Sequence, residues 1–152
     1  FGYPMLDAGA KLYSSAASVK PRDEIAAKGL KKYDQMEAPG IERPEECFFH
    51  EEFKGGDAFV MIHNETLKLA AIVHFDAKVF PLLCEWKCMR AGDYALGLEP
   101  TTSGVDNRSV ARENGMLTYL EPGASREYNV SLEFTDDPAI IERYRKASGK
   151  AD

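Results

Sequence analysis

The most constraining feature of this sequence is a series of short, strand-like segments separated by turns. Beyond residue 46, runs rich in Val, Ile, Phe, Tyr and Leu alternate with turn residues at intervals of about eight to twelve positions. Such spacing is typical of antiparallel β-structure. We therefore expect an all-β fold, an antiparallel β-sandwich or a barrel, built from segments 47–49, 58–63, 67–75, 79–89, 94–100, 115–120 and 126–134.

The clearest hairpin is predicted between segments 115–120 and 126–134, joined by the turn EPGAS. In the second segment the apolar residues Tyr128, Val130, Leu132 and Phe134 alternate with polar ones, which is the period-two pattern of a half-buried strand. A second short connection, at residues 64–65, is predicted between the strands at 58–63 and 67–75.

Helix is expected in two places at most. The run RDEIAAKGLKKYDQM predicts one short surface helix, interrupted at Gly29. In the tail, Asp137 is an N-cap candidate, Pro138 suits the first helical position and Lys and Arg gather near the end. We expect residues 1–136 to form one sandwich unit and residues 137–152 a tail that is a short helix or frays.

Composition excludes several classes of protein. The 152 residues carry a formal net charge of -6, which argues against a nucleic-acid partner because neutralising phosphates requires a basic face. The apolar stretches are too short to span a bilayer, so no membrane partner is expected. Without a secretory signal pattern, we expect a cytoplasmic protein. Cys47, Cys84 and Cys88 are an odd number and are expected to be buried, reduced thiols.

Glu99 is the first candidate for chemistry. The apolar strand at 94–98 stops at Glu99 and Pro100, and a polar loop follows. A partly desolvated carboxylate at a rigid strand end would have a raised pKa, suited to a general base. The alternative is an ordinary strand terminus at the surface, where Glu and Pro are both common.

Other candidates follow from spacing. On a strand, Glu46 and His50 share one face and could orient a hydroxylated substrate, although a charged strand edge that faces solvent is the commoner explanation. Trp86 and Lys87 could form an aromatic platform beside a hydrogen-bond donor, or a core tryptophan beside an exposed lysine. Arg108 lies in a polar loop, either in a site or simply solvated. The histidines of the 58–75 hairpin are expected to be structural.

Four ordered motifs resemble the galactose mutarotase-like proteins. The resemblance is to a bacterial aldose 1-epimerase-like branch catalogued as a domain of unknown function. The motifs are a Gly-x-Glu-Pro strand end, an arginine in the next loop, a REXGXL segment and an L-x-P-G turn, here at 97–100, 108, 112–117 and 120–123. The opening GxPxL pattern at 2–6 also matches. The resemblance reaches to about Asp136 and implies part of a two-sheet supersandwich.

In aldose 1-epimerases, the glutamate at this strand end is the general base. The resemblance therefore implies that Glu99 removes the proton of the anomeric hydroxyl, while a histidine protonates the ring oxygen. The ring opens, the C1–C2 bond rotates and closure gives the other anomer, with no metal or redox cofactor. Glu46, His50, Lys87 and Arg108 are expected to line the sugar pocket beside Glu99. Thr102 departs from the asparagine common in the family at that position.

The acid histidine of the family would lie just before Phe1. The chain opens on FGYPMLD without an initiator methionine, and we expect it to be a fragment. Half of a two-sheet sandwich exposes edges and apolar faces, so we expect the folded unit to need a missing N-terminal segment, a second copy of the chain in a homo-oligomer, or both.

Three functions remain open from the sequence. The preferred one is the C-terminal part of a sugar mutarotase or related epimerase, with a monosaccharide or sugar derivative as ligand. The others are a non-catalytic carbohydrate-binding module and a structural sandwich domain.

Overall fold

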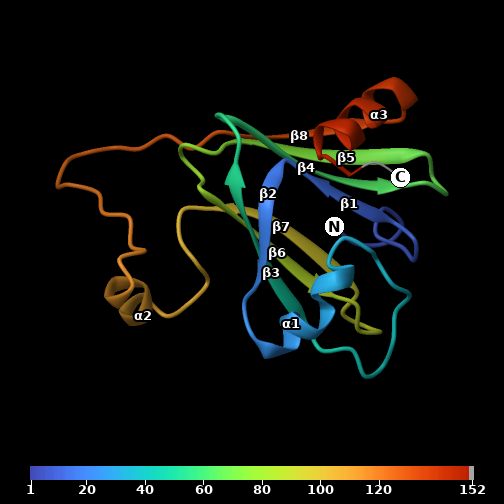
Figure 1. The fold of residues 1–152 in the computed structure, drawn as a ribbon, viewed down its shortest axis with the longest axis horizontal. Coiled ribbons are helices and arrows are strands. Elements are labelled where there is room, and N and C mark those ends of the chain that lie inside the picture. The colour runs from blue at the N-terminus through green and yellow to red at the C-terminus, as the bar shows by residue number, and fades with distance from the viewer. Residues whose placement is uncertain (151–152) are drawn as a thin grey trace.

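The computed structural model describes residues 1–150 and consists of two four-stranded antiparallel sheets packed face to face (Figure 1). The first, sheet A, has the order β1-β4-β5-β8 and comprises Lys11–Ser14, Asp57–Asn64, Leu69–Asp76 and Val130–Thr135. The second, sheet B, has the order β2-β3-β6-β7 and comprises Ala16–Pro21, Glu46–Phe53, Leu82–Cys88 and Ala95–Thr101. The predicted antiparallel β-sandwich is confirmed.

The main core lies between the two sheets. Its inward side chains include Leu12, Val60 and Ile62 of sheet A and Leu83 and Leu96 of sheet B, all fully buried. Successive side chains of a strand point to opposite faces, so these residues define the inner face of each sheet. Every other residue of β6 and β7 therefore lies on the outer face of sheet B.

The outer face of sheet A is covered by the C-terminal helix α3 (Pro138–Ala147) (Figure 1). Ile141 and Tyr144 of this helix pack on Phe59, Met61 and Ile72, with the Phe59 and Tyr144 ring centroids 4.8 Å apart. The Asp137 side chain accepts a hydrogen bond from the Ala139 N–H, and Pro138 takes the first turn. The tail is therefore helical, with the predicted cap.

The other helices are short. Helix α1 (Glu24–Gly29) begins at the cap Asp23 and ends at Gly29, where the sequence predicted an interruption, and a 3-10 turn η1 (Leu30–Lys32) follows. A third helix, α2 (Arg108–Glu113), was not predicted, so the expectation of at most two helices is wrong by one. Its polar sequence lacks an apolar stripe, which is why the pattern did not reveal it.

The predicted hairpin between 115–120 and 126–134 is wrong. Residues 115–129 contain no strand, and β8 pairs with β5 instead, with Leu132 opposite Val73 and Phe134 opposite Ala71. The EPGAS sequence does form a turn at 122–123. However, β8 pairs with β5, whose Ala71, Val73 and Phe75 belong to the main core, and residues 115–120 stay on the segment that leads to it. The predicted short connection between β4 and β5 exists, but its turn spans residues 65–68 rather than 64–65.

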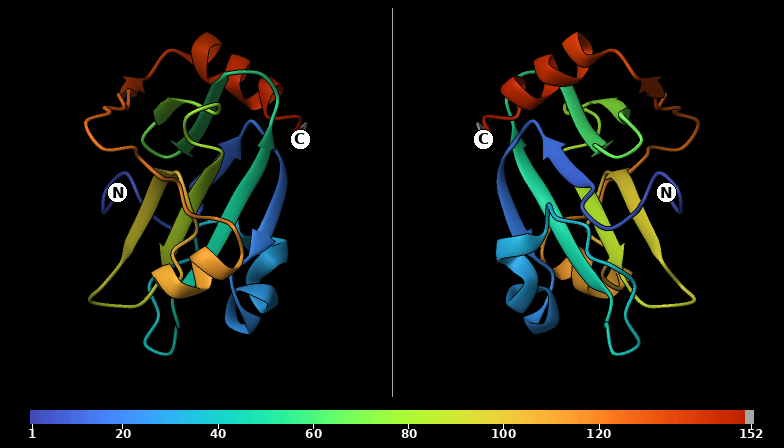
Figure 2. Two further views of the ribbon diagram at one scale, coloured as in Figure 1. Left: turned by 90° about the vertical axis from the view of Figure 1, so that its left-hand side faces the viewer. Right: turned by 90° about the vertical axis from the view of Figure 1, so that its right-hand side faces the viewer.

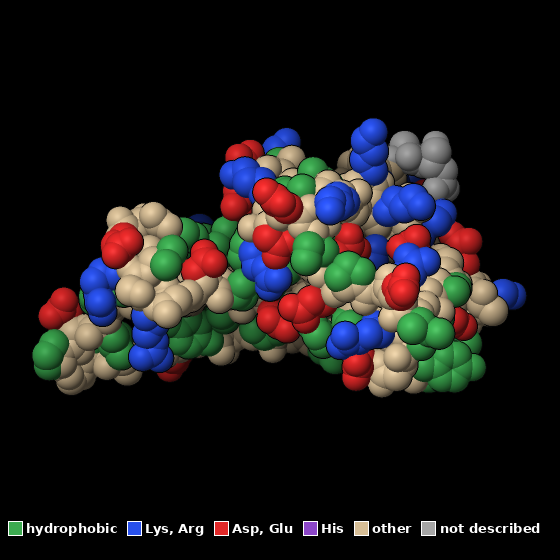
Figure 3. All heavy atoms as spheres, turned by 90° about the horizontal axis from the view of Figure 1, so that it is seen from below, with side chains coloured by type: hydrophobic (Ala, Val, Ile, Leu, Met, Phe, Trp, Pro, Cys, Tyr) green, Lys and Arg blue, Asp and Glu red, His purple; other side chains and the backbone are tan. Residues whose placement is uncertain are grey.

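Between β7 and β8, residues 102–129 form an extended arm that carries α2 and projects from the body of the sandwich (Figures 1 and 3). Seen from below, hydrophobic side chains are exposed along this arm and where it meets the body (Figure 3). The exposed apolar residues of the arm are Val105, Val110, Met116, Tyr119, Leu120 and Tyr128. The arm has little core of its own.

Candidate functional site

Glu99 lies near the end of β7 with its side chain exposed on the outer face of sheet B. Its register partner on β6 is Cys84, and the partner of Cys84 on β3 is Phe49. Paired residues of antiparallel strands carry their side chains on the same face, so these three residues form one row across the sheet. Lys20 of β2, opposite Phe49, completes the row.

The side chain of Glu99 folds back over Gly97, two residues earlier on the same face. A Cβ built on Gly97 would lie 2.4 Å from Glu99 Oε1 and 3.4 Å from the Cβ of Trp86. Only a residue without a side chain leaves this space for the carboxylate. The Gly-x-Glu spacing of the strand therefore has a physical reason: the glycine seats the glutamate beside the tryptophan.

Trp86 supplies an aromatic surface next to that carboxylate. It is half-buried on the outer face, opposite Gly97 on one side and Cys47 on the other. Its indole Nε1 donates a 2.9 Å hydrogen bond to Glu45 Oε2, and Arg22 lies 3.8 Å from the same carboxylate. These contacts fix the indole in one orientation. Neither predicted arrangement at 86–87 is correct as a pair: Trp86 does lie on the Glu99 face, but Lys87 is buried on the inner face.

Lys20 and Phe49 extend the face away from Glu99. Lys20 pairs with Glu51, and the hydrogen bond to that carboxylate raises the pKa of the lysine. Phe49 is half-buried and lies under the start of the arm, where a Cβ on Gly104 would be 4.0 Å from its ring. The outer face thus combines an aromatic pair with acids and bases, the mixture that sugar sites use for stacking and hydroxyl hydrogen bonds.

Two buried thiols form the floor of this face. Cys47 and Cys84 are free and reduced, with their sulfur atoms 3.1 Å apart. The hydrogen bond between them raises the pKa of Cys84 and lowers that of Cys47, and burial opposes ionisation of both. The prediction of buried, reduced cysteines is confirmed for all three.

The structure does not bring Glu46, His50 and Lys87 to Glu99. Glu46 and His50 share a face, as predicted, and Lys87 lies on it too because it pairs with Glu46, but that face is the inner one. His50 and Lys87 are 0% and 1% exposed. The sequence pattern shows which residues share a face, but not which face packs on sheet A. The expectation that these three line a pocket beside Glu99 is therefore corrected.

On the inner face these side chains form a buried polar cluster. His50 Nε2 lies 2.9 Å from Glu85 Oε2, and both side chains are inaccessible to solvent. Burial raises the pKa of Glu85, and the adjacent histidine opposes this in part. Lys87 donates to the carbonyl oxygens of Lys32 and Gln35 at 2.8 Å each, which ties η1 to the sheet. Burial likewise raises the pKa of Glu46.

Arg108 begins α2 on the arm and is exposed. Within residues 1–150, no hydrogen bond or ion pair joins it to another side chain. The structure therefore does not place Arg108 against Glu99. The sequence analysis did not identify Lys20, Arg22 or Phe49. Alternate residues of a strand share one face, and this alternation along β3 could have indicated Phe49.

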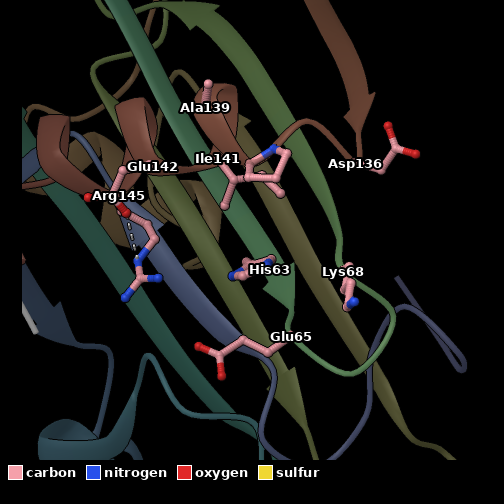
Figure 4. Close-up of a pocket in the computed structure, with 9 residues that line it drawn as sticks. His63, Glu65, Lys68, Asp136, Ala139, Ile141, Glu142 and Arg145 are labelled. Carbon is pink, nitrogen blue, oxygen red and sulfur yellow. Dashed lines mark ion pairs between the residues drawn. The ribbon is translucent and has the colours of Figure 1, made fainter.

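A separate hollow of about 750 Å³ lies on the opposite side of the molecule, between the β4–β5 turn and the start of α3 (Figure 4). His63 is at its base and Arg145 and Glu142 are at its rim, 3.9 Å from each other. Burial lowers the pKa of His63. His74, in β5, lies 3.0 Å from Glu133 of β8. Both histidines belong to sheet A, away from the Glu99 face.

No group of three or more His, Cys, Asp or Glu side chains within residues 1–150 is arranged to hold a metal ion. No helix in this range is long and apolar enough to cross a membrane.

Comparison with known proteins agrees with this architecture. Residues 1–134 match the model of the domain of unknown function DUF4432, and the chain belongs to this family. A crystal structure of a candidate aldose 1-epimerase from Klebsiella pneumoniae subsp. pneumoniae MGH 78578 superposes with a TM-score of 0.87 at 25% sequence identity. The match covers 98% of this chain and 40% of that one. No curated protein matches the chain. The predicted resemblance to the mutarotase-like proteins is confirmed.

Proposed function

We propose that this chain is the C-terminal part of a sugar mutarotase-like domain and that Glu99 is its general base. The observation that carries the proposal is the exposed Glu99 carboxylate, seated over Gly97 beside Trp86 on the outer face of sheet B. The resemblance to a candidate aldose 1-epimerase supports the class of substrate, a monosaccharide or sugar derivative.

The chemistry follows from the groups on that face. The pyranose ring stacks on Trp86, and the Glu99 carboxylate accepts the proton of the anomeric hydroxyl. As the C1–O5 bond breaks, an acid protonates the ring oxygen, which gives the open-chain aldehyde. Rotation about C1–C2 and the reverse steps yield the other anomer. A positioned acid or base contributes roughly 10²–10⁴-fold to such a reaction.

The acid is not supplied by a histidine of this chain. All three histidines lie elsewhere: His50 on the inner face of sheet B, and His63 and His74 in sheet A. No histidine of this chain therefore faces Glu99, so the acid of the proposed reaction is a different group. For this reason a second candidate function, a carbohydrate-binding module without catalysis, is retained for residues 1–152 alone.

The test is Glu99→Gln in the protein that contains residues 1–152, with anomer exchange followed by NMR on several aldoses. Glutamine keeps the size of the side chain but cannot accept the proton. We expect turnover to fall by roughly 10²–10⁴-fold with sugar affinity nearly unchanged. Glu133→Gln, on the opposite sheet, is the matched control. Near-wild-type turnover of Glu99→Gln would refute the assignment. Sugar binding without exchange in the parent protein would favour the binding module.

A further inference from the structure

Two cysteines of sheet B bring their sulfur atoms together on adjacent strands. Strands β3 and β6 run side by side in this sheet (Figure 2), and Cys47 lies opposite Trp86 in their register. Cys84 lies opposite Phe49, so the two cysteines are diagonal neighbours on the outer face. Their sulfur atoms are 3.1 Å apart. Because a disulfide bond is about 2.0 Å long, the sulfurs need to approach by only about 1 Å to form one.

The same spacing does not suit a metal ion held between the two thiols. Two thiolates bound to one tetrahedral zinc ion at about 2.3 Å are about 3.8 Å apart. Such an ion also needs further ligands, and the described part of the chain has no group of three or more His, Cys, Asp or Glu side chains arranged to hold one. The spacing of the pair therefore favours a sulfur–sulfur bond.

The two thiols differ in how readily they ionise. The hydrogen bond with Cys84 lowers the pKa of Cys47, burial opposes this, and the positive charge of Arg22 lowers it further. Arg22 is close because its N–H donates to the Cys47 carbonyl at 2.9 Å. The negative charges of Glu99 and Asp23 raise the pKa of Cys47 in part. The pKa of Cys84 is raised by the hydrogen bond and by burial. Since the thiolate is the nucleophile, Cys47 is the attacking thiol.

Burial decides which oxidant can reach the two thiols. Cys47 and Cys84 are 2% and 1% exposed, and the half-buried rings of Phe49 and Trp86 belong to the same face. An oxidant that contains a disulfide leaves a mixed disulfide on the attacking sulfur, and a buried sulfur has no space for that bulk. Hydrogen peroxide is little larger than water and leaves only a hydroxyl group on the sulfur. The site therefore suits hydrogen peroxide.

We infer that Cys47 and Cys84 are a redox-active dithiol that hydrogen peroxide converts to a disulfide, which alters the outer face of sheet B. First, the Cys47 thiolate attacks a peroxide oxygen and the O–O bond breaks, which gives a sulfenic acid and a hydroxide ion that takes a proton from solvent. The Cys84 sulfur then attacks the sulfenic sulfur. The S–O bond breaks, the S–S bond forms, and the hydroxyl group leaves with the Cys84 proton as water. Two thiols are oxidised, and one peroxide is reduced to two waters.

The disulfide would form directly beside the residues of the candidate site. Trp86 is the register partner of Cys47, and Glu99 is the register partner of Cys84. Movement of the two sulfurs toward each other therefore occurs next to the indole and the carboxylate, and the oxidation state of the pair changes their surroundings. The inference does not depend on the proposed function, because the thiol chemistry involves no sugar.

The test treats the protein with hydrogen peroxide, alkylates the remaining thiols in denaturant and locates the modified residues by mass spectrometry. We expect a linked peptide that joins Cys47 and Cys84, and its loss after reduction with dithiothreitol. Cys88 is the internal control, because it is 1% exposed on the same face of β6 but has no thiol partner among the described residues. It should stay alkylatable, and Cys88→Ser should oxidise like wild type.

Two serine variants separate the roles of the pair. Cys84→Ser keeps a hydroxyl donor for Cys47 but cannot form the disulfide, so a sulfenic acid should accumulate at Cys47 and react with dimedone. In Cys47→Ser, burial still raises the pKa of Cys84. Dimedone labelling of Cys84 in this variant should be at least roughly tenfold slower than that of Cys47 in Cys84→Ser, because the thiolate fraction falls tenfold for each unit of pKa. Circular dichroism verifies that both variants are folded.

The change in the outer face is measured by the fluorescence of Trp86, with Trp86→Phe as the background. Its emission should change on oxidation and return on reduction with dithiothreitol.

Three results would overturn the inference. The first is peroxide treatment that leaves Cys47 and Cys84 alkylatable. The second is oxidation of Cys88 as fast as that of the pair, which means that the pair has no special reactivity. The third is a disulfide that leaves the Trp86 emission unchanged, which means that the pair does not act on the outer face. Because none of these readouts involves a sugar, failure here is distinguishable from failure of the Glu99 assignment.

Discussion

The two faces of sheet B carry similar side chains in opposite environments. The inner face holds the His50–Glu85 pair and Lys87, all without solvent access, whereas the outer face holds the exposed Glu99 and Lys20 around half-buried aromatic rings. Neighbouring residues of one strand lie on opposite faces and therefore in opposite environments. Ionisable residues in adjacent positions can therefore serve stability in one case and ligand chemistry in the other, and mutations should separate these effects.

The largest effect on stability is expected from His50→Ala. Removal of the imidazole leaves the buried Glu85 carboxyl without its hydrogen-bond partner, at a cost of about 1–3 kcal/mol, and the cavity left by the ring adds to that cost. Glu99→Ala is the outer-face counterpart and should leave the free energy of unfolding nearly unchanged. Urea denaturation of both variants measures the difference. Equal stability of the two variants would show that the inner pair is not structural.

Lys87→Met should have the next largest effect. The substitution keeps the apolar stem but leaves the carbonyl oxygens of Lys32 and Gln35 without their donor. A lost partner of a buried polar group costs about 1–3 kcal/mol. Lys20→Met on the outer face should be nearly neutral. Hydrogen exchange in residues 30–36 provides a local readout, since η1 should loosen only when Lys87 is replaced.

Gly97→Ala should affect the site rather than the fold. Its methyl group would occupy the space of the Glu99 carboxylate and displace it. A misplacement of about 1 Å in a catalytic group can cost 10²-fold in rate, so anomer exchange in the complete protein should fall while thermal stability changes little. Gly104→Ala is the control, because the nearest atom to its new methyl group would be 3.7 Å away. Equal exchange rates in the two variants would contradict the proposed seat of Glu99.

The last expected effect is the pH dependence of stability that Glu85 contributes. Burial raises the pKa of Glu85 above its ordinary value of 4.5. The neutral form is therefore favoured in the folded state, so its contribution to stability is complete below pH 4.5 and is lost as the pH rises through the folded pKa. As the pH rises from 4.5 through the folded pKa, the wild type should lose this stability and Glu85→Gln should not, so the variant becomes more stable relative to wild type. If the free energies of unfolding of wild type and Glu85→Gln change in parallel from pH 4 to pH 8, this prediction is wrong.

The placement of Glu99 shows how far the sequence could predict the site. A glutamate at the end of an apolar strand, two residues after a glycine, is a local pattern, and the motif resemblance added a role for it. The prediction that Glu46 and His50 share one face of a strand also rested on a local pattern, and it is correct. Their predicted position beside Glu99 failed because the distance between two strands' side chains depends on register and on which face is covered.

The sequence by itself determined the elements whose causes are local. Asp23 and Asp137 cap helices because their carboxylates accept neighbouring backbone N–H groups, and Gly29 ends α1. Only the tertiary structure decided that β8 pairs with β5 rather than with its neighbour in sequence, and that His50 and Lys87 face the core. Alternation along a strand is set by backbone geometry, but the choice of inner face is made by the burial of apolar surface between sheets, which joins residues far apart in the chain.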